Sequence, residues 1–218
     1  MKLVIINGSP RGKSSNSDVI TNWVTTEMDK NIQIEQYYAV KIHTHKEAVD
    51  AIEDNTTVLV VFPLYVDAMP GITKLFFEKL ESIAHTKQYI NIYFIIHSGF
   101  EGAKHCRAVE RYLVYLSEHL GFNYMGTTIK PGSEGFRLMP EEYTKDIRND
   151  FVQLSKDITK GVPFNKDVLS NLAGFETLPD EYLKNIKASD GESDYFTYLL
   201  KQNNSLENSF DKPYQKRK

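Results

Sequence analysis

The sequence predicts an α/β fold with one doubly wound, five-stranded parallel sheet that carries helices on both faces. Short apolar runs rich in β-branched residues are typical of strands that are buried on both sides. Between these runs, apolar residues recur every three or four positions, which is typical of helices. Strands that alternate with helices pair in parallel and need cover on both faces. With 218 residues, 41% of them hydrophobic, the chain is long enough to bury one such core.

The predicted strands are bounded by residues that form turns. The first run leads into Gly8, and the third ends at Pro63. Five strands match the smaller doubly wound fold, whose ligands lie beyond the carboxyl ends of the strands. In chain order, strands are predicted over residues 3–6, 32–40, 57–62, 89–96 and 122–129.

The predicted helices also have recognisable starts and ends. A turn rich in Ser and Asn precedes the first helix, and Pro70 and Gly71 precede the second. Gly121 follows the third helix in the position of a C-cap. The helical patterns of the sheet region cover residues 16–28, 72–83, 102–120 and 142–160.

The chain is predicted to consist of a sheet domain, residues 1–160, and a helical C-terminal extension, residues 161–218. Three short helical patterns occupy the extension, over residues 165–172, 180–187 and 194–202. The extension carries more apolar and aromatic residues than a free tail tolerates in water. We therefore expect it to pack on the core or on a partner subunit.

Composition excludes several classes of function. The formal net charge of −3 gives no reason to expect nucleic acid as a partner. The single cysteine, Cys106, excludes an internal disulfide and a metal site built on several thiolates. No apolar run approaches the ~18 residues of a membrane-spanning helix, and the first residues lack a signal-peptide pattern. We expect a cytoplasmic protein that binds no metal, no nucleic acid and no membrane.

The loop after the first strand has the composition of an anion-binding site. It supplies the hydroxyls of Ser9 and Ser17, the amide of Asn16 and the guanidinium of Arg11. The N–H groups of a helix N-terminus lie there too, and the helix dipole favours negative charge at that end. A phosphate is the ligand that this loop predicts.

A nucleoside triphosphatase is the first alternative, because residues 8–14 resemble a P-loop. That motif needs four residues between its glycines, whereas three separate Gly8 from Gly12. Pro10 also lacks an N–H group for a phosphate, and the third strand ends in Pro63 where an Asp would be needed. This alternative is therefore disfavoured.

Two further loops follow the third and fourth strands, at the same edge of the predicted sheet. Residues 62–71 form an aromatic segment stiffened by prolines, and residues 97–102 form a Gly-containing loop. An anion site beside a flat, aromatic wall suits a ligand with a phosphate at one end and a planar ring at the other. Flavin mononucleotide (FMN) has that shape.

Three motifs in this order resemble the NADPH-dependent FMN reductase family of flavodoxin-like oxidoreductases. They are Gly8-Ser9-Pro10-Arg11 with Asn16-Ser17, Pro63-Leu64-Tyr65 with Met69-Pro70-Gly71-Ile72-Thr73-Lys74, and Ser98-Gly99-Phe100. The resemblance covers about residues 1–129 and implies a flavodoxin-like fold. Relatives with an iron–sulfur cluster carry a cysteine motif between these loops, which this chain lacks.

The resemblance also implies a role for each motif. The first would bind the FMN phosphate, the second would line the isoalloxazine ring, and the third would reach the pyrimidine edge of the flavin. The residues concerned are Ser9, Arg11, Asn16 and Ser17 in the first motif, Pro63, Leu64, Tyr65 and Met69 in the second, and Ser98, Gly99 and Phe100 in the third.

The expected function is that of an oxidoreductase, in which FMN takes a hydride from NADPH or NADH and passes electrons to a small acceptor. A quinone, an azo or nitro compound and free flavin are all possible acceptors. No side chain is assigned a catalytic role, and His97 is expected to be a structural, hydrogen-bonded histidine. A flavodoxin-like electron carrier, or an FMN-binding module without turnover, is the alternative. Because relatives of this fold commonly dimerise, we also expect a homodimer.

The turn-rich loop over residues 130–140 follows the fifth strand. Loops of this length are more often functional than structural, so we expect it to lean over the flavin.

Overall fold

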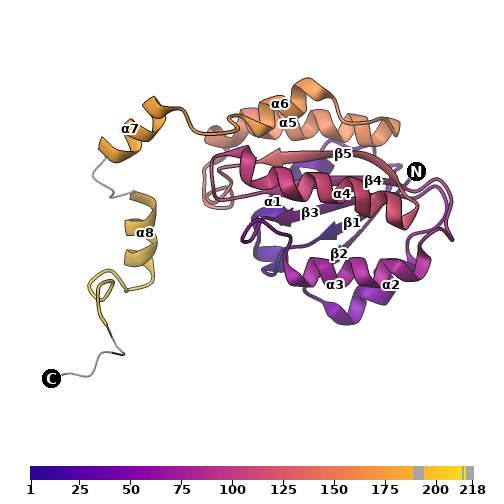
Figure 1. Ribbon diagram of the computed structural model, residues 1–218, viewed down its shortest axis with the longest axis horizontal. Coiled ribbons are helices and arrows are strands. Elements are labelled where there is room, and N and C mark those ends of the chain that lie inside the picture. Colours follow the sequence, from indigo (N-terminus) through magenta and orange to yellow (C-terminus); the bar gives the residue numbers. More distant parts are fainter. Residues whose placement is uncertain (189–193, 213, 215–218) are drawn as a thin grey trace. The chain divides into compact units, whose positions relative to one another are not determined.

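The computed structural model describes residues 1–188, 194–212 and 214 (Figure 1). Its sheet has five parallel strands in the order β2-β1-β3-β4-β5. This is the strand order of the flavodoxin-like fold, and the predicted fold class is confirmed. The strands are β1 (Lys2–Asn7), β2 (Gln33–Tyr38), β3 (Thr57–Pro63), β4 (Asn91–His97) and β5 (Asn123–Lys130).

The helices follow the strands in the predicted alternation. One short helix between the second and third strands was not predicted, and the first helix ends three residues before the predicted boundary at residue 28. The helices are α1 (Asn16–Thr25), α2 (His45–Asp50), α3 (Gly71–Leu80), α4 (Arg107–Leu120), α5 (Glu141–Lys160), α6 (Lys166–Ala173), α7 (Asp180–Ala188) and α8 (Asp194–Gln202).

Alternation along the strands divides the core into two layers. On β1, Val4 and Ile6 face the layer built with α2, α3 and α4. Leu3 and Ile5 point the other way, toward α1, α5 and α6. All four side chains are fully buried, because each face of the sheet is covered by helices. Both layers are therefore built mainly from apolar side chains, and the polar side chains of the central strands lie at the strand ends.

The chain forms two compact units, residues Met1–Thr177 and Leu178–Lys218. The first unit includes α6, whose Leu172 is buried, and Phe164, whose ring lies 4.8 Å from that of Tyr93 on β4. The first part of the predicted extension therefore contributes to the core of the sheet unit. The functional division at residue 160 stays a prediction, and residues 189–193, 213 and 215–218 of the extension lie outside the described residues.

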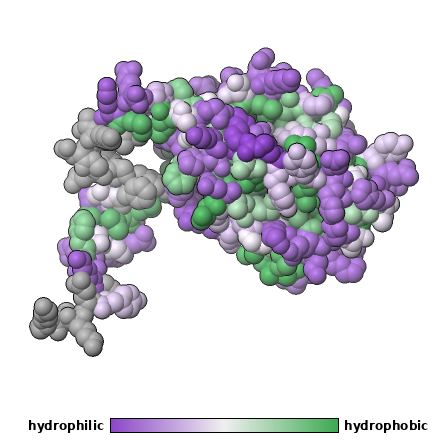
Figure 2. Space-filling model, viewed as in Figure 1, coloured by the Kyte–Doolittle hydropathy of each residue, from purple (hydrophilic) through white to green (hydrophobic). Residues whose placement is uncertain are grey.

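Among the helices of the described residues, none combines the length and the apolar character needed to cross a membrane. The surface over α3 and α4 is mixed, with apolar side chains between hydrophilic ones (Figure 2). The exposed apolar side chains on α4 are Tyr112, Val114 and Tyr115.

Truncation should distinguish the two halves of the extension. A chain that ends at Lys160 loses Phe164 and Leu172 and should be less stable by at least the ~3–5 kcal/mol that a buried Phe contributes. A chain that ends at Thr177 keeps both residues and should unfold cooperatively, with the stability of the first unit. Urea unfolding followed by circular dichroism measures this. Equal stability of the two truncated chains would contradict the placement of α6 in the core.

Candidate functional site

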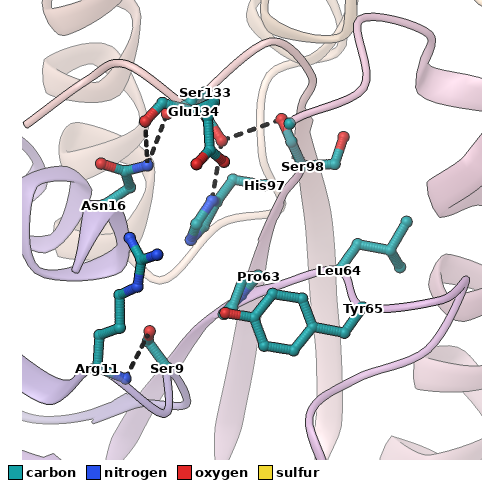
Figure 3. Close-up of a pocket in the computed structure, with 11 residues that line it drawn as sticks. Ser9, Arg11, Asn16, Pro63, Leu64, Tyr65, His97, Ser98, Ser133 and Glu134 are labelled. Atoms are coloured by element: carbon teal, nitrogen blue, oxygen red, sulfur yellow. Dashed lines mark hydrogen bonds between the residues drawn. The ribbon is translucent and has the colours of Figure 1, made fainter. Parts of the chain in front are cut away.

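A cavity of about 180 Å³ lies beyond the carboxyl ends of β1, β3 and β4 (Figure 3). Its walls come from four loops, all of which were predicted from the sequence to lie near the ligand. The fourth follows β5. The lining residues are Ser9, Arg11, Asn16, Pro63, Leu64, Tyr65, His97, Ser98, Gly99, Ser133 and Glu134. The structure thus brings together most of the predicted site residues, whereas Ser17, Met69 and Phe100 do not line the cavity.

The buried carboxamide of Asn7 organises the first loop from below. It donates to the Gly12 carbonyl at 3.4 Å and to Ser15 Oγ at 3.3 Å, and it accepts from the Ser9 N–H at 3.0 Å. Gly12 has φ +56°, a conformation that other residues rarely adopt. Ser15 caps α1 by accepting from the Asp18 N–H. The loop therefore has one conformation that aims the start of α1 at the cavity.

Close packing beneath the same loop requires a glycine at position 8. A Cβ there would lie 2.5 Å from Thr73 Oγ1 and 2.8 Å from Phe62 Cβ. Thr73 on α3 also donates to the Gly8 carbonyl at 2.7 Å. Gly8 thus lets the start of α3 approach the first loop, which brings the second loop beside it.

The first loop offers positive charge and hydrogen-bond donors to a ligand. Arg11 is exposed, and no carboxylate among the described residues pairs with it. The backbone N–H of Arg11 donates to Ser9 Oγ at 3.3 Å, which leaves the Ser9 hydroxyl hydrogen for another acceptor. The first N–H groups of α1 have no acceptor within the helix. This end of the cavity suits a phosphate.

The side chains of Asn16 and Ser17 bond within the protein. The Asn16 amide donates to the carbonyls of Ser133 and Glu134 at 2.7 and 3.1 Å, and its oxygen accepts from the Arg137 N–H. Ser17 is fully buried, with its Oγ 2.7 Å from His97 Nε2. Asn16 lines the cavity and Ser17 does not, and a phosphate contact by either side chain stays a prediction.

The second loop forms the apolar wall of the cavity. Pro63 and Leu64 are buried, whereas Tyr65 is about half exposed. Tyr65 and Ala68 exchange backbone hydrogen bonds of 2.8 and 3.1 Å across a tight turn. This turn fixes where the Tyr65 ring stands beside the cavity.

The two central residues of that turn are strained. Val66 has φ +49° and Asp67 has φ +57°, the pattern of a type I′ turn, which favours Asn and Gly. A β-branched residue at positive φ is rare, because its Cβ crowds the backbone. Val66 is also 98% exposed, so packing against the described residues does not compensate this strain.

Met69 and Phe100 lie away from the cavity. Met69 lines a separate, more apolar cavity of about 410 Å³ between the start of α3 and α4, with Val109 and Tyr112. Phe100 is two-thirds exposed and stacks on His105 at 5.0 Å. Their predicted contacts with a flavin therefore have no counterpart among the cavity walls, and they stay predictions.

His97 ends β4 and is buried beneath the cavity. Its Nε2 lies 2.7 Å from Ser17 Oγ and its Nδ1 lies 2.9 Å from Ser133 Oγ. Burial lowers the pKa of His97 to about 3, so the imidazole is neutral. The structural role expected for His97 agrees with this geometry.

Ser133 and Glu134 were not singled out by sequence reasoning, and His97 was placed in the 97–102 loop of the site but expected to be structural. The position of His97 at the carboxyl end of a central strand was a usable signal, since ligands of this fold lie there. Ser133 and Glu134 belong to the 130–140 loop, which was expected near the ligand without any residue being singled out. The Glu134 carboxylate lies close to Gly99: a Cβ built on Gly99 would lie 3.3 Å from Glu134 Oε2.

Comparison with known proteins supports the fold assignment. No protein-family model matches the sequence, and no curated protein matches it either. Among solved structures, an NADPH-quinone reductase from P. pentosaceus superposes with a TM-score of 0.54 at 13% identity, over 71% of this chain and 98% of that one. A flavone reductase superposes with a TM-score of 0.53 at 10% identity, over the whole of both chains. An NADH:FMN oxidoreductase in its apo form superposes with a TM-score of 0.52 at 13% identity, over 83% of this chain and 97% of that one.

At these identities the likeness establishes the flavodoxin-like fold, and the function has to be argued from the site.

Val66→Asn should stabilise the protein by about 1 kcal/mol, because Asn tolerates the left-handed conformation that strains a valine. Thermal unfolding should show a rise of ~2–4 °C for a chain of this size. Val66→Ile keeps the branched Cβ and serves as the control, with no gain expected. A loss of stability in Val66→Asn would show that the turn is not strained.

Burial of neutral His97 should make stability depend on pH. The pKa is about 3 in the folded state and ~6.5 in the unfolded chain, so the unfolded chain binds a proton first as the pH falls. This contribution is complete above pH ~6.5 and is lost toward pH 3, with a slope of up to ~1.4 kcal/mol per pH unit. The difference in unfolding free energy between wild type and His97→Gln isolates the effect. A difference that does not change with pH would contradict it.

Proposed function

We propose that the chain is an FMN-dependent oxidoreductase that takes a hydride from NADPH or NADH and passes electrons to a small acceptor. The observation that carries this proposal is the pairing of two unlike walls at one edge of the sheet. Unpaired Arg11 and the start of α1 form one wall, and Pro63, Leu64 and Tyr65 form the other. FMN presents a phosphate at one end and a flat ring at the other, which matches this pair of walls. The reductase names of the structural neighbours point the same way.

Size and chemistry of the cavity agree with a flavin that is held by its phosphate end. A volume of about 180 Å³ is below the ~300–1,000 Å³ of sites that enclose a whole ligand. The phosphate and its chain would therefore be enclosed, and the ring would lie at the open side beside Tyr65. Arg11 and Ser9 would bind the phosphate with charge-assisted hydrogen bonds.

Bound FMN would supply the redox chemistry, and the protein would orient its ring. Pro63 and Leu64 would exclude water from one side of the ring, and half-exposed Tyr65 would leave room for a second planar molecule. The Gly99 backbone and the Glu134 carboxylate would face the polar edge of the ring. Since both ring nitrogens of His97 are hydrogen-bonded within the protein, His97 would not exchange protons with a substrate.

Assembly as a homodimer and location in the cytoplasm are further parts of the proposal. Exposed Tyr112, Val114 and Tyr115 on α4 support an interface with a second copy. Burial raises the pKa of the Cys106 thiol to about 11, so it is an inert thiol suited to a reducing compartment.

The purified protein with FMN should be yellow, and anaerobic addition of NADPH or NADH should bleach it. An added quinone should then restore the colour. A flavodoxin-like carrier would stay oxidised in the presence of nicotinamide. Absence of any bleaching in a protein that does bind FMN would reject the oxidoreductase and favour the carrier.

Arg11→Ala should weaken FMN binding by about 1–3 kcal/mol, because a charge-assisted hydrogen bond to the phosphate is lost. Riboflavin has no phosphate, so its affinity should not change. Lys13→Ala is the matched control, since Lys13 is an exposed cation of the same loop that does not line the cavity. Fluorescence titration measures the affinities of wild type and of both variants for FMN and for riboflavin. Equal weakening of FMN and riboflavin would mean that Arg11 does not bind the phosphate.

A further inference from the structure

Three buried polar side chains form a chain of hydrogen bonds beneath the cavity. It runs from Ser17 on α1 through His97 on β4 to Ser133 in the loop after β5. Figure 3 shows the part of this chain from His97 to Ser133. From Ser133 it continues to the Ser98 carbonyl, 3.0 Å from Ser133 Oγ. None of the three residues is more than 4% exposed. The chain thus joins three segments that are far apart in the sequence.

The direction of the hydrogen bonds follows from counting hydrogens. If Ser133 donates to the Ser98 carbonyl, Ser133 Oγ accepts from His97 Nδ1–H, and bare Nε2 accepts from the Ser17 hydroxyl. Every hydrogen then has an acceptor. In the opposite direction, His97 Nε2–H donates to Ser17 Oγ, and the Ser133 hydroxyl donates to His97 Nδ1. The Ser17 hydroxyl hydrogen then has no acceptor among the described residues, and Ser133 Oγ and the Ser98 carbonyl oxygen lie 3.0 Å apart with no hydrogen between them. A buried, unsatisfied donor costs about 1–3 kcal/mol, so the first arrangement is favoured.

We propose that His97 is the positioning residue of the site: as a neutral imidazole with its hydrogen on Nδ1, it locks the 130–140 loop to the N-terminus of α1. Ser133 and Glu134 of that loop line the cavity, and Asn16 on α1 holds the same two residues through their carbonyls. The loop is therefore tied to α1 twice, once through Asn16 and once through His97. This role does not depend on which ligand the cavity binds.

The protein carries its own reporter of this loop. Trp23 on α1 is the only tryptophan of the chain, and its ring centre lies 5.2 Å from that of Phe136 in the loop. Phe136 is 3% exposed and belongs to the core layer that contains α1 and α5. Trp23 is partly buried and also packs on Phe151. Release of the loop would expose more of its ring to solvent, so its fluorescence reports whether the lock is closed.

Nitrogen-15 NMR of the histidine rings tests the lock in the wild-type chain, without any variant. His97 should be neutral at pH 7, with its hydrogen on Nδ1. His45 is an internal reference, because its Nε2 lies 2.7 Å from the Ala39 carbonyl and has to carry the hydrogen. The two buried histidines should therefore show opposite tautomers. A hydrogen on Nε2 of His97 would overturn the proposal.

Two substitutions separate the two bonds of His97. The amide of His97→Asn can replace Nδ1–H and keep the bond to Ser133, whereas His97→Gln places its amide near Nε2 and keeps the bond to Ser17 alone. Acrylamide quenching of Trp23 should stay near the wild-type value in His97→Asn. It should rise at least twofold in His97→Gln and in Ser133→Ala.

His45→Gln is the matched control for a general loss of stability. It removes a buried histidine from the opposite layer, where the ring packs on Phe76, and it should leave Trp23 quenching unchanged. Equal quenching in His97→Asn and His97→Gln, whether raised or unchanged, would show that the bond to Ser133 does not hold the loop.

A titration with FMN adds a second readout, which rests on the proposed function. The affinity should fall about tenfold in His97→Gln and less than twofold in His97→Asn. If wild type does not bind FMN, the proposed function fails, and the tautomer and quenching results still decide the role of His97. Equal affinities of the two variants for FMN would overturn the positioning role.

Discussion

Parallel pairing in the order β2-β1-β3-β4-β5 places the carboxyl ends of β1, β3 and β4 side by side. Each wall of the cavity begins at one of those ends or at the end of β5. The strand interiors are buried on both faces by apolar side chains, and the buried polar residues Asn7, His97 and Ser98 lie at this edge. The site is thus a consequence of how the sheet is covered. Its polar groups divide into those that bond to one another and those, such as Arg11, that remain for a ligand.

Much of the fold could be predicted from the sequence, because apolar runs and helical spacing are local patterns. The strands and the order of helices follow from them, as do the three loops after the first, third and fourth strands. The missing helix α2 has six residues, too few to give a periodic pattern. The residues after Lys160 were harder to assign, since it is the tertiary packing of Phe164 on Tyr93 and the burial of Leu172 that place this first part of the extension in the core.

The candidate site could be predicted by residue type and position, but not by hydrogen-bond partner. Asn16 and Ser17 have the side chains of phosphate ligands, and they stand at a helix N-terminus, which is why the sequence favours them. Their actual partners are main-chain carbonyls more than a hundred residues away and the ring of a buried histidine. No local pattern reveals such partners, because they depend on the position of the loop after β5 in the folded chain. Arg11 differs, since it is exposed and none of the carboxylates in the described part of the chain pairs with it, which leaves it available for a ligand.

The central claim is that this edge of the sheet binds a flavin through a terminal phosphate. Native mass spectrometry of the full-length protein, incubated with equal amounts of FMN, FAD and riboflavin, tests it most directly. The account predicts that the FMN complex predominates, because Arg11 and the start of α1 would bind a terminal phosphate. Riboflavin has no phosphate, and the phosphates of FAD form an internal diphosphate that is linked to adenosine. Equal retention of the three flavins, or no flavin complex at all, would contradict it.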